Sequence, residues 1–475
     1  MSQAQTTPLR AKIAALDFEI TLHKQRLVGL EAARDALYAE LRRVAVFPIN
    51  TVPPELLSEI FVHCIAGESS AGYNTPPRLF SRVCKSWAQI AAGTPELWRT
   101  LTLDLDGGDE FLLQMASTWM QNCKGRLALE LYHTAADARD DPHPQTTDLF
   151  SLIAGNGESL KTFRCSLHPA AMLRLAQNSL SFVNLEELSL HFDRAYDTEP
   201  VLAAGSVTFI DMRMLRKVAL RYIPLSSISL PWSQITEFKC NVYSADEVLH
   251  ALQLLVNVVR LEVDLPADAA EEDRSGLPNI VHPNVRHFCI WEPNQEEHHE
   301  QRHILEFLTL PNIETLSTST INEGALAAFF RRSGHPPLES LSFRAPFSSS
   351  YSDWPHFAHL DQLKALKILR PTAPLLRTLF PALKQPEFLT RLETLNLVDL
   401  PVVETIDGIL EDFMDMMQQR DEAWKSGNGS VARLRCVHLL RHTLWKRWKT
   451  ISVPAKHRFT LKRWEEEGLD VCIGC

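Results

Sequence analysis

Hydrophobic residues follow three different spacings along this chain, and each spacing predicts a different kind of structure. The first covers residues 9–46, where apolar residues alternate three and four positions apart over about five heptads. The apolar residues of this seam are Ile13, Leu16, Ile20, Leu27, Leu30, Leu37, Leu41 and Val44. A seam of this kind is typical of a coiled coil, or of one long helix packed against the body of a protein.

Two polar residues interrupt the heptad seam. His23 and Arg34 stand at positions where the spacing predicts an apolar residue. Polar residues at seam positions set the register or the number of helices in a coiled coil, at a cost in stability. The pattern therefore leaves two structures open: self-association through this helix, or a single helix that leads into the next unit.

The second spacing covers residues 47–100 and predicts a small unit of short helices. Two apolar stripes follow three- and four-residue steps. The first stripe contains Leu56, Leu57, Ile60, Phe61 and Cys64, and the second contains Val83, Trp87, Ile90 and Ala91. Pro53 or Pro54 suits the first turn of the first helix, because that turn needs no N–H donor. Thr51 and Ser81 are the predicted caps of the two helices.

Stop and start signals close the helical unit. Gly93 predicts the end of the second helix, and Thr94-Pro95-Glu96 predicts the cap and first turn of a third helix, which ends near Trp98. Three helices of this length bury little surface by themselves. We therefore expect the unit to dock onto a neighbour.

The third spacing is the motif Leu-x-x-Leu-x-Leu, which returns through residues 101–475 with aliphatic or aromatic variants. The copies begin at Leu160, Leu185, Leu215, Ile235, Val258, Val285, Ile313, Leu338, Leu363, Leu392 and Leu434. From Leu160 to Leu392 there are nine intervals over 232 residues, about 26 each, inside the 20–29 range of leucine-rich repeats. The predicted fold is therefore an α/β solenoid, in which each copy is a short strand followed by a helical or irregular return.

Further elements are expected around this repeat array. Residues 101–105 and 127–131 predict one or two strands that precede it, and residues 458–468 and 469–473 predict a terminal helix and strand. Helical returns are expected at 245–255, 303–308 and 324–332. The asparagine that many leucine-rich repeats place in the turn is missing from nearly every copy, so we expect an irregular array.

Composition narrows the class of protein. The chain has 475 residues, of which 45% are hydrophobic and 22% charged, which is ordinary for a globular protein. A net charge of −10 argues against a nucleic-acid or anionic-membrane partner. The nine cysteines show no paired framework, and no apolar run reaches transmembrane length. We expect an intracellular protein, cytoplasmic or nuclear or both, with reduced thiols.

The segment 47–100 resembles an F-box, a helical module of cullin-based ubiquitin ligases. Pro53, Glu55, Leu57, Ile60 and Phe61 match the family's opening Leu-Pro-x-Glu-x-Leu-x-x-Ile-Phe, with Val52 where leucine is usual. The closing half is matched by Val83, Cys84, Lys85, Trp87, Pro95, Leu97 and Trp98. The connection from Cys64 to Arg78 is longer than usual, so the chain resembles an F-box-like protein with C-terminal leucine-rich repeats, a type frequent in fungi.

This resemblance implies a non-catalytic substrate-recognition subunit of an SCF-type cullin ubiquitin ligase. The F-box-like unit would bind the adaptor subunit, and through it a cullin, and the repeats would bind a target protein for ubiquitination. The residues expected to shape or support the adaptor surface are Pro53, Leu56, Leu57, Ile60, Phe61, Val83, Cys84, Trp87 and Trp98. The alternative is a leucine-rich-repeat interaction scaffold with a helical cap and no link to ubiquitination.

Basic residues on successive predicted strands are the candidate target-binding residues. Lys217, Lys239 and Arg260 occupy outward positions in three successive copies, and His287 follows in the next. A surface formed by these basic residues could bind an acidic or phosphorylated segment of a target. Glutamates at 237 and 262 stand beside them, which leaves open an ordinary solvated face of mixed charge.

Three further motifs resemble metal, nucleic-acid or redox sites, and the sequence around each of them argues against that role. The segment His299–His303 matches the zinc motif His-Glu-x-x-His, but its flank is polar and no third ligand is evident. The basic and aromatic run 441–463 is followed at once by three glutamates, which favours a charged outer face over a nucleic-acid site. A terminal Cys-x-x-Cys at 472–475 has no second pair. We therefore expect no metal, no cofactor and no catalytic residue.

Overall fold

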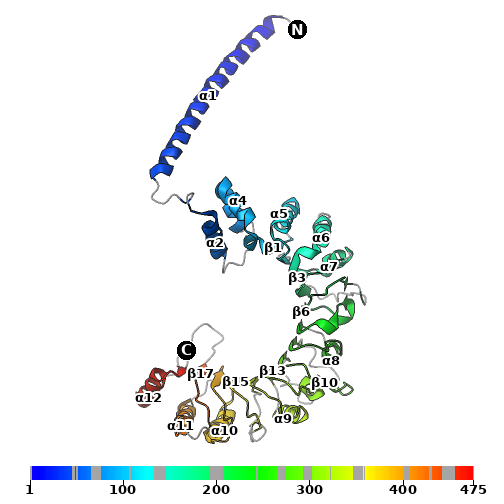
Figure 1. Cartoon of the computed structure of the whole chain (residues 1–475), viewed down its shortest axis with the longest axis vertical. Helices are drawn as coiled ribbons and strands as arrows, with labels where there is room; N and C mark the ends of the chain where they lie inside the picture. Colours follow the sequence, from blue (N-terminus) through cyan, green and yellow to red (C-terminus); the bar gives the residue numbers. More distant parts are fainter. Residues whose placement is uncertain are drawn as a thin grey trace. The chain divides into compact units, whose positions relative to one another are not determined.

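The computed structural model of the chain describes residues 3–44, 49, 52–65, 76–105, 109–132, 146–178, 180–192, 205, 207–241, 244–265, 274–292, 302–320, 323–345, 357, 359–400, 406–426, 431–440 and 455–473. The chain divides into two compact units, Met1–Leu97 and Trp98–Cys475 (Figure 1). The division falls close to the boundary between the helical and repeat segments of the sequence.

Helices make up the first unit over its described residues. They are α1 (Gln3–Val44), α2 (Pro54–Ile65), α3 (Pro76–Val83), α4 (Lys85–Gly93) and the 3₁₀ helix η2 (Pro95–Trp98), whose last residue belongs to the second unit. α1 agrees with the long helix that the heptad spacing predicts, and all of its described side chains are exposed. The predicted cap Thr51 and the whole connection between α2 and α3 lie outside the described residues.

The prediction for the second apolar stripe is wrong in one respect. Its residues do not share one helix capped by Ser81, because α3 ends at Val83 and α4 begins at Lys85. Cys84 between them is extended, with φ −161° and ψ 169°. Ser81 lies inside α3, where its hydroxyl donates to the carbonyl oxygen of Pro77 at 2.8 Å. Ser81 therefore does not cap α4.

An aromatic cluster forms the core of α2, α3 and α4. The ring of Phe61 stacks on Phe80 at a centroid distance of 4.2 Å, and the ring of Trp87 lies 4.7 Å from Phe61. The buried Thr94 follows α4, and its hydroxyl donates to the carbonyl oxygen of Ile90 at 2.7 Å. The same hydroxyl is 2.9 Å from the hydroxyl of Ser58, so α2 is tied to the end of α4.

One parallel sheet runs through the second unit. Its fourteen strands among the described residues pair in chain order. They are β1 (Thr100–Asp104), β2 (Leu127–Tyr132), β3 (Leu160–Leu167), β4 (Glu187–Phe192), β6 (Lys217–Arg221), β8 (Glu237–Asn241), β9 (Arg260–Asp264), β11 (His287–Trp291), β13 (Thr315–Thr320), β14 (Ser340–Arg344), β15 (Ala365–Leu369), β16 (Thr394–Val398), β17 (Cys436–Leu440) and β18 (Asp470–Ile473). Two short parallel pairs lie outside it: β5 (Val207–Thr208) with β7 (Ile228–Ser229), and β10 (Ile280–Val281) with β12 (Leu308–Thr309).

Helices occupy many of the returns between these strands, and α5 to α11 lie along one side of the sheet in Figure 1. The α-helices are α5 (Asp109–Asn122), α6 (Thr146–Gly155), α7 (Pro169–Ala176), α8 (Ala245–Leu254), α9 (Glu323–Arg332), α10 (Ala373–Lys384), α11 (Ile406–Lys425) and α12 (Ala455–Glu466). Short 3₁₀ helices stand at η3 (Gly157–Ser159), η4 (Leu225–Ser227), η5 (Trp232–Gln234) and η7 (Ile304–Phe307). The predicted return at 303–308 is thus a 3₁₀ turn.

Alternation along the strands explains why the repeat motif folds in this way. In β9, Leu261 and Val263 are buried, whereas Arg260 and Asp264 are exposed. The first apolar residue of the same copy, Val258, is buried just before the strand. All eleven motif copies place a strand in the sheet, and the strands expected before and after the array are also present. The prediction of a parallel sheet with intervening helices is confirmed.

Candidate functional site

Helix α2 divides its apolar residues between two faces. Leu57 and Phe61 are buried in the aromatic core of the unit. Leu56 and Ile60, each one position earlier, are 56% and 48% exposed. Residues four apart share a helix face, so Leu56 and Ile60 form an exposed apolar pair. The single apolar stripe expected from the sequence is in fact one buried stripe and one exposed stripe.

A second exposed apolar pair lies on α3. Val83 is 59% exposed and Leu79 is 43% exposed. Their neighbour Phe80 turns inward to stack on Phe61. Sequence reasoning included Val83 among the candidate adaptor residues and missed Leu79, although the four-residue step between them was the available signal. We call Leu56, Ile60, Leu79 and Val83 the exposed apolar residues of α2 and α3.

The remaining candidate adaptor residues differ in where they lie. Pro53 is exposed just before α2, and Cys84 is half-buried where α3 gives way to α4. Trp87 is half-buried in the aromatic core. Trp98 is buried in the second unit, where its ring meets Trp119 edge-on at 4.7 Å. Trp98 therefore contributes to the start of the sheet unit.

The four candidate target-binding residues lie on adjacent strands, in two rows of the sheet. The first row contains the consecutive register partners Glu187, Lys217, Glu237, Arg260 and His287. Lys239 belongs to the second row, where its register partner is Glu262. Charge alternates along the first row. The basic residues therefore do not form an uninterrupted basic strip.

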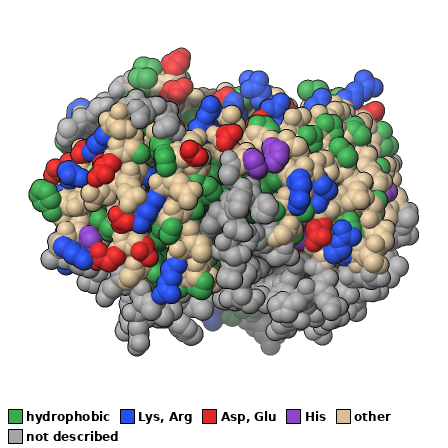
Figure 2. Space-filling view, turned by 90° about the horizontal axis from the view of Figure 1, so that it is seen from below, with side chains coloured by type: hydrophobic (Ala, Val, Ile, Leu, Met, Phe, Trp, Pro, Cys, Tyr) green, Lys and Arg blue, Asp and Glu red, His purple; other side chains and the backbone are tan. Residues whose placement is uncertain are grey.

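Ion pairs reinforce this alternation. Lys217 Nζ lies 3.0 Å from Glu237 Oε1, and Lys239 Nζ lies 2.5 Å from Glu262 Oε1. These pairs are well exposed, and exposed pairs contribute about 0–1 kcal/mol to stability. On the face that Figure 2 shows, basic and acidic side chains are also intermixed over the described residues. The geometry is that of a solvated face of mixed charge.

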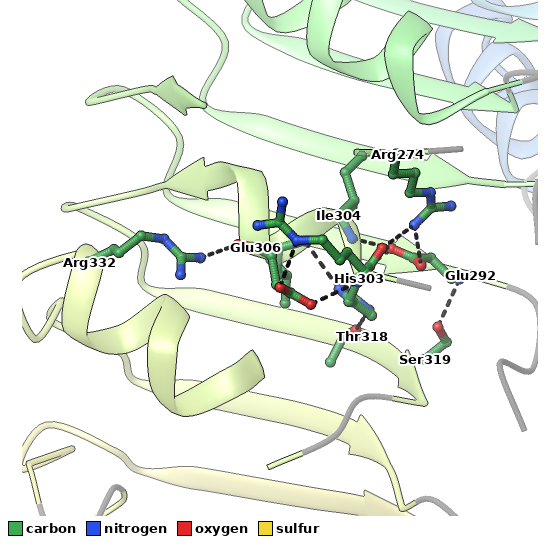
Figure 3. Close-up of polar contacts among 10 residues, drawn as sticks. Arg274, Glu292, His303, Ile304, Glu306, Thr318, Ser319 and Arg332 are labelled. Carbon is green, nitrogen blue, oxygen red and sulfur yellow. Dashed lines mark hydrogen bonds and ion pairs between the residues drawn. The ribbon is translucent and has the colours of Figure 1, made fainter. Parts of the chain in front are cut away.

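A buried network of polar side chains lies beside β11 and η7 (Figure 3). The side chains of Arg274 and Glu292 are 2% and 1% exposed and form an ion pair of 3.1 Å. Glu292 also accepts a hydrogen bond from the backbone N–H of Ile304 at 3.0 Å. Arg274 donates to the carbonyl oxygen of Arg302 at 2.9 Å. The carboxylate therefore fixes two loop segments to the end of the strand.

His303 completes this network as the cap of η7. Its Nδ1 accepts a hydrogen bond from the backbone N–H of Leu305 at 3.1 Å, and its Nε2 is 3.2 Å from the hydroxyl of Thr318. The carboxylate of Glu306 accepts a hydrogen bond from the backbone N–H of His303 at 3.1 Å, which completes a capping box. Since Nδ1 is an acceptor, the assigned tautomer carries its proton on Nε2.

These contacts bear directly on the His-Glu-x-x-His motif. His303 is its second histidine, and both of its ring nitrogens already have protein partners within the described chain. The first three residues of the motif lie outside the described residues. A histidine whose two nitrogens are engaged in this way has no lone pair left for a zinc ion. The structural role of His303 is that of a helix cap.

The stability of the protein should fall in weak acid because of His303. Burial lowers the pKa of this imidazole, and the attraction of Glu292 for the protonated ring only partly opposes the shift. Between the ordinary pKa of 6.5 and the lower pKa of the folded state, the unfolded chain therefore binds more protons at this residue than the folded chain does. His303 costs no stability above pH 6.5, and below it the cost grows by at most about 1.4 kcal/mol per pH unit until the folded state is protonated as well.

Urea unfolding at several pH values checks this expectation. His303→Asn keeps an acceptor that can cap η7 but removes the titrating ring, so its unfolding free energy should fall less steeply between pH 6.5 and 5 than that of the wild type. Equal slopes for the two proteins would contradict the assigned neutral state of His303.

Three potential metal ligands meet on the last two strands. Cys436 and His438 of β17 and Asp470 of β18 place one ligand atom each within 4.8 Å of one another. His438 Nε2 lies 3.2 Å from Asp470 Oδ2, a hydrogen-bonding distance that explains the contact without an ion. Burial and the nearby carboxylate raise the pKa of the Cys436 thiol. An ion here would depend on water for its remaining ligands.

A small cavity lies near the end of the chain, between α11 and α12. It is lined by Met417, Trp424 and Trp464 among others, and its volume of about 20 Å³ is room for one water molecule. Arg420 at its edge donates to the carbonyl oxygens of Leu383, Phe388 and Leu389. Burial lowers the pKa of Arg420 to about 10. This arginine closes the end of α10 instead of facing a ligand.

The other two motifs fall partly outside the described residues. In the basic run, residues 441–454 are not described, and Lys456 and His457 of α12 both contact Glu411 of α11. In the terminal Cys-x-x-Cys, Cys475 is not described. Over the described residues, the helices are too short or too polar to cross a lipid bilayer.

Comparison with known proteins adds no relative. No protein-family model matches the chain, and no curated protein matches it with significance. The sites above therefore depend on their geometry and on the motif residues themselves.

Proposed function

We propose that this protein is a non-catalytic substrate-recognition subunit of an SCF-type cullin ubiquitin ligase. The F-box-like helices α2, α3 and α4 bind the adaptor subunit, the adaptor links them to a cullin, and the sheet of the second unit binds the target. The observation that carries most weight is the division of α2 into a buried pair, Leu57 and Phe61, and an exposed pair, Leu56 and Ile60.

The exposed pair has the properties of a binding surface. Each of these aliphatic side chains is about half exposed, so covering it would contribute about 1 kcal/mol by hydrophobic burial. The opposite stripe of α2 already packs inside the helical unit, where Phe61 contacts the rings of Phe80 and Trp87. An amphipathic helix with anchors four residues apart suits a partner groove or a partner helix. The buried aromatic residues would then hold α2 and α3 in the orientation that the adaptor needs.

In the finer form of the proposal, the second unit is an irregular leucine-rich-repeat solenoid. Its support is the sequential parallel order of the strands and the recurrence of buried aliphatic residues in every copy. Repeat sheets of this kind present the exposed side chains of successive strands to partners as one continuous concave surface. The receptor itself performs no chemistry, because ubiquitin transfer follows from holding a target lysine near a conjugating enzyme.

The target-binding face is tested by charge reversal. Lys217→Glu with Lys239→Glu should abolish capture of an acidic target, because it places new negative charges beside Glu237 and Glu262. Adaptor binding should stay intact, because neither lysine belongs to the helical unit. The measurement is quantitative affinity capture from cells in which the ligase is blocked, comparing each captured protein with the wild type.

Lys364→Glu is the matched control for this experiment. Lys364 is a lysine of similar exposure paired with Glu339 at 2.8 Å, and the two residues immediately precede β15 and β14, farther along the sheet. Loss of the same captured proteins from this control, or retention of every one by the double variant, would contradict a role for Lys217 and Lys239 in target binding. Arg260 and His287 belong to the same proposed face.

Co-purification of the full chain with the adaptor and a cullin tests the function as a whole. Under the proposal, both should accompany the tagged wild-type chain in stoichiometric amounts. A chain that captures partner proteins but neither ligase subunit would instead be an interaction scaffold without a link to ubiquitination.

A further inference from the structure

Helix α1 carries an apolar seam that is open to solvent along its whole length. The nine apolar side chains at its a and d heptad positions are between 49% and 69% exposed. They are Leu9, Ile13, Leu16, Ile20, Leu27, Leu30, Leu37, Leu41 and Val44. With 42 residues, α1 is about 63 Å long. A lone helix gains nothing from such a seam, because helices in water are stabilised mainly by packing one face against a partner.

Charged residues flank this seam in a regular pattern. In the heptad the seam positions are a and d, and the flanking positions are e and g. In a parallel coiled coil, a residue at g lies opposite the e residue of the following heptad on the other helix. In α1 three such combinations are charged on both sides, and all three join opposite charges. They are Lys12 with Asp17, Glu19 with Lys24, and Arg26 with Glu31.

We propose that α1 forms a parallel, in-register, two-stranded coiled coil with a second copy of this chain. The twofold symmetry makes each charge pair occur twice, so the interface gains six complementary pairs. The two combinations toward the C-terminal end of α1 are uncharged or singly charged and therefore neutral to the pairing. A second copy of α1 supplies the complementary charge at each of the three combinations that are charged on both sides.

The opposite orientation has two registers of nearly full overlap, in which flanking positions of the same kind face each other. In one of them Lys24 and Arg26 each approach their own copies and Asp17 faces Glu31, which disfavours the pairing. In the other, shifted by one heptad, Asp17 faces Lys24 and Glu19 faces Arg26. The charges therefore suit a second copy of α1 as the partner, and the trapping experiment below decides the direction.

The first two heptads of the seam favour two helices over three or four. Ile13 and Ile20 occupy their a positions and Leu16 the d position between them, whereas Leu27 and Leu41 occupy later a positions. β-Branched residues at a with leucine at d are the combination that favours parallel dimers. The polar seam residue Arg34 turns its guanidinium to Asp35 of the same helix, at 2.9 Å. Its charge therefore has a partner outside the seam.

The oligomeric state of the full chain is the first test. In sedimentation velocity at micromolar concentration, the wild type should have twice the 53.8 kDa mass of one chain. Wild-type protein that remains monomeric at tens of micromolar would overturn the proposal. Dimerisation does not depend on adaptor binding, so this result is separate from the test of the proposed function.

Two charge variants test the pairing itself. Lys12→Glu with Arg26→Glu changes only g positions, and Asp17→Lys with Glu31→Lys changes only e positions. Each variant alone places like charges at two of the three combinations, so its dimer dissociation constant should rise at least tenfold. Mixed together, the two variants restore opposite charges at every combination, and a heterodimer should form. A mixture no more dimeric than its components would refute the proposed register.

Disulfide trapping tests direction and alignment. Leu16 occupies a d position, so in a parallel, in-register dimer it meets its own copy. Leu16→Cys should form an intermolecular disulfide on mild oxidation, whereas Gln25→Cys, on the outer f position, should add no cross-linking beyond the wild type. Equal cross-linking by the two variants would exclude the arrangement.

Discussion

Glu292→Ala should lower the free energy of unfolding of the sheet unit by about 3–5 kcal/mol. The substitution leaves the guanidinium of Arg274, which is 2% exposed, without its carboxylate partner. It also removes the acceptor for the backbone N–H of Ile304 at the start of η7. Breaking a buried pair by removing one partner is costly because the other charge stays buried. Among the described carboxylates of the sheet unit, we expect replacement of Glu292 by alanine to cause the largest loss of stability.

Urea unfolding followed by circular dichroism measures this effect. Glu262→Ala is the matched control, since Glu262 is also a glutamate paired with a basic residue in the same sheet, but its side chain is 44% exposed. The control should change stability by less than about 1 kcal/mol. If the two variants had the same unfolding midpoint, the network around Glu292 would not have the structural role assigned to it.

Leu56→Asp with Ile60→Asp should weaken adaptor binding at least a hundredfold without unfolding the helices. Both side chains are about half exposed, and neither belongs to the aromatic core. Placing two carboxylates in an apolar interface removes the hydrophobic gain and adds the cost of desolvating charge, together at least about 3 kcal/mol. That energy corresponds to more than a hundredfold in the dissociation constant.

Two companion variants make this binding experiment decisive. Leu56→Met with Ile60→Val keeps the apolar character of the pair, so it should bind the adaptor within a few-fold of the wild type. Phe61→Ala removes a stacked ring from the core, so it should disrupt the fold of the helical unit itself, with a cost of about 3–5 kcal/mol. Normal adaptor binding by the folded double aspartate variant would exclude α2 as the binding surface.

The sheet could be predicted from the sequence because its signal is periodic. Each copy of the motif places apolar residues two apart, and a strand turns such residues to one face. Buried pairs such as Leu261 and Val263 follow directly. The spacing between copies then allows parallel strands, because parallel neighbours need a return of a dozen or more residues. The α1 helix was predictable for the same kind of reason, since its seam is regular over many heptads.

The helical unit was harder to predict because two helices share one spacing. Val83 and Trp87 are four residues apart, which suggests a common helix, yet Cys84 between them is extended. The break is a tertiary effect: it lets Phe80 and Trp87 approach Phe61 from two directions. The periodicity also placed Leu56 and Leu57 in one apolar stripe. Only the packing of the folded unit shows that Leu56 and Ile60 are exposed and that Leu57 and Phe61 are buried.

The buried network could not be predicted from local pattern. Arg274, Glu292 and His303 come from three separate segments, and each lies within or at the edge of a largely polar stretch of the sequence: 271–275, 292–297 and 298–303. Polar segments of this kind predict exposed loops. The burial arises because each charged group finds its partner on another segment. In the same way, the spacing of the His-Glu-x-x-His motif suggested a zinc site, whereas its second histidine, His303, caps η7. Spacing alone does not determine what a histidine contacts.

The most direct test of the central claim is a calorimetric titration of the purified adaptor subunit into the full-length chain. The proposed function predicts saturable binding of one adaptor per chain for the wild type and for Leu56→Met with Ile60→Val, and none measurable for Leu56→Asp with Ile60→Asp. A folded wild-type chain that releases no heat of binding and shows no complex by sedimentation would contradict the assignment as a ligase receptor.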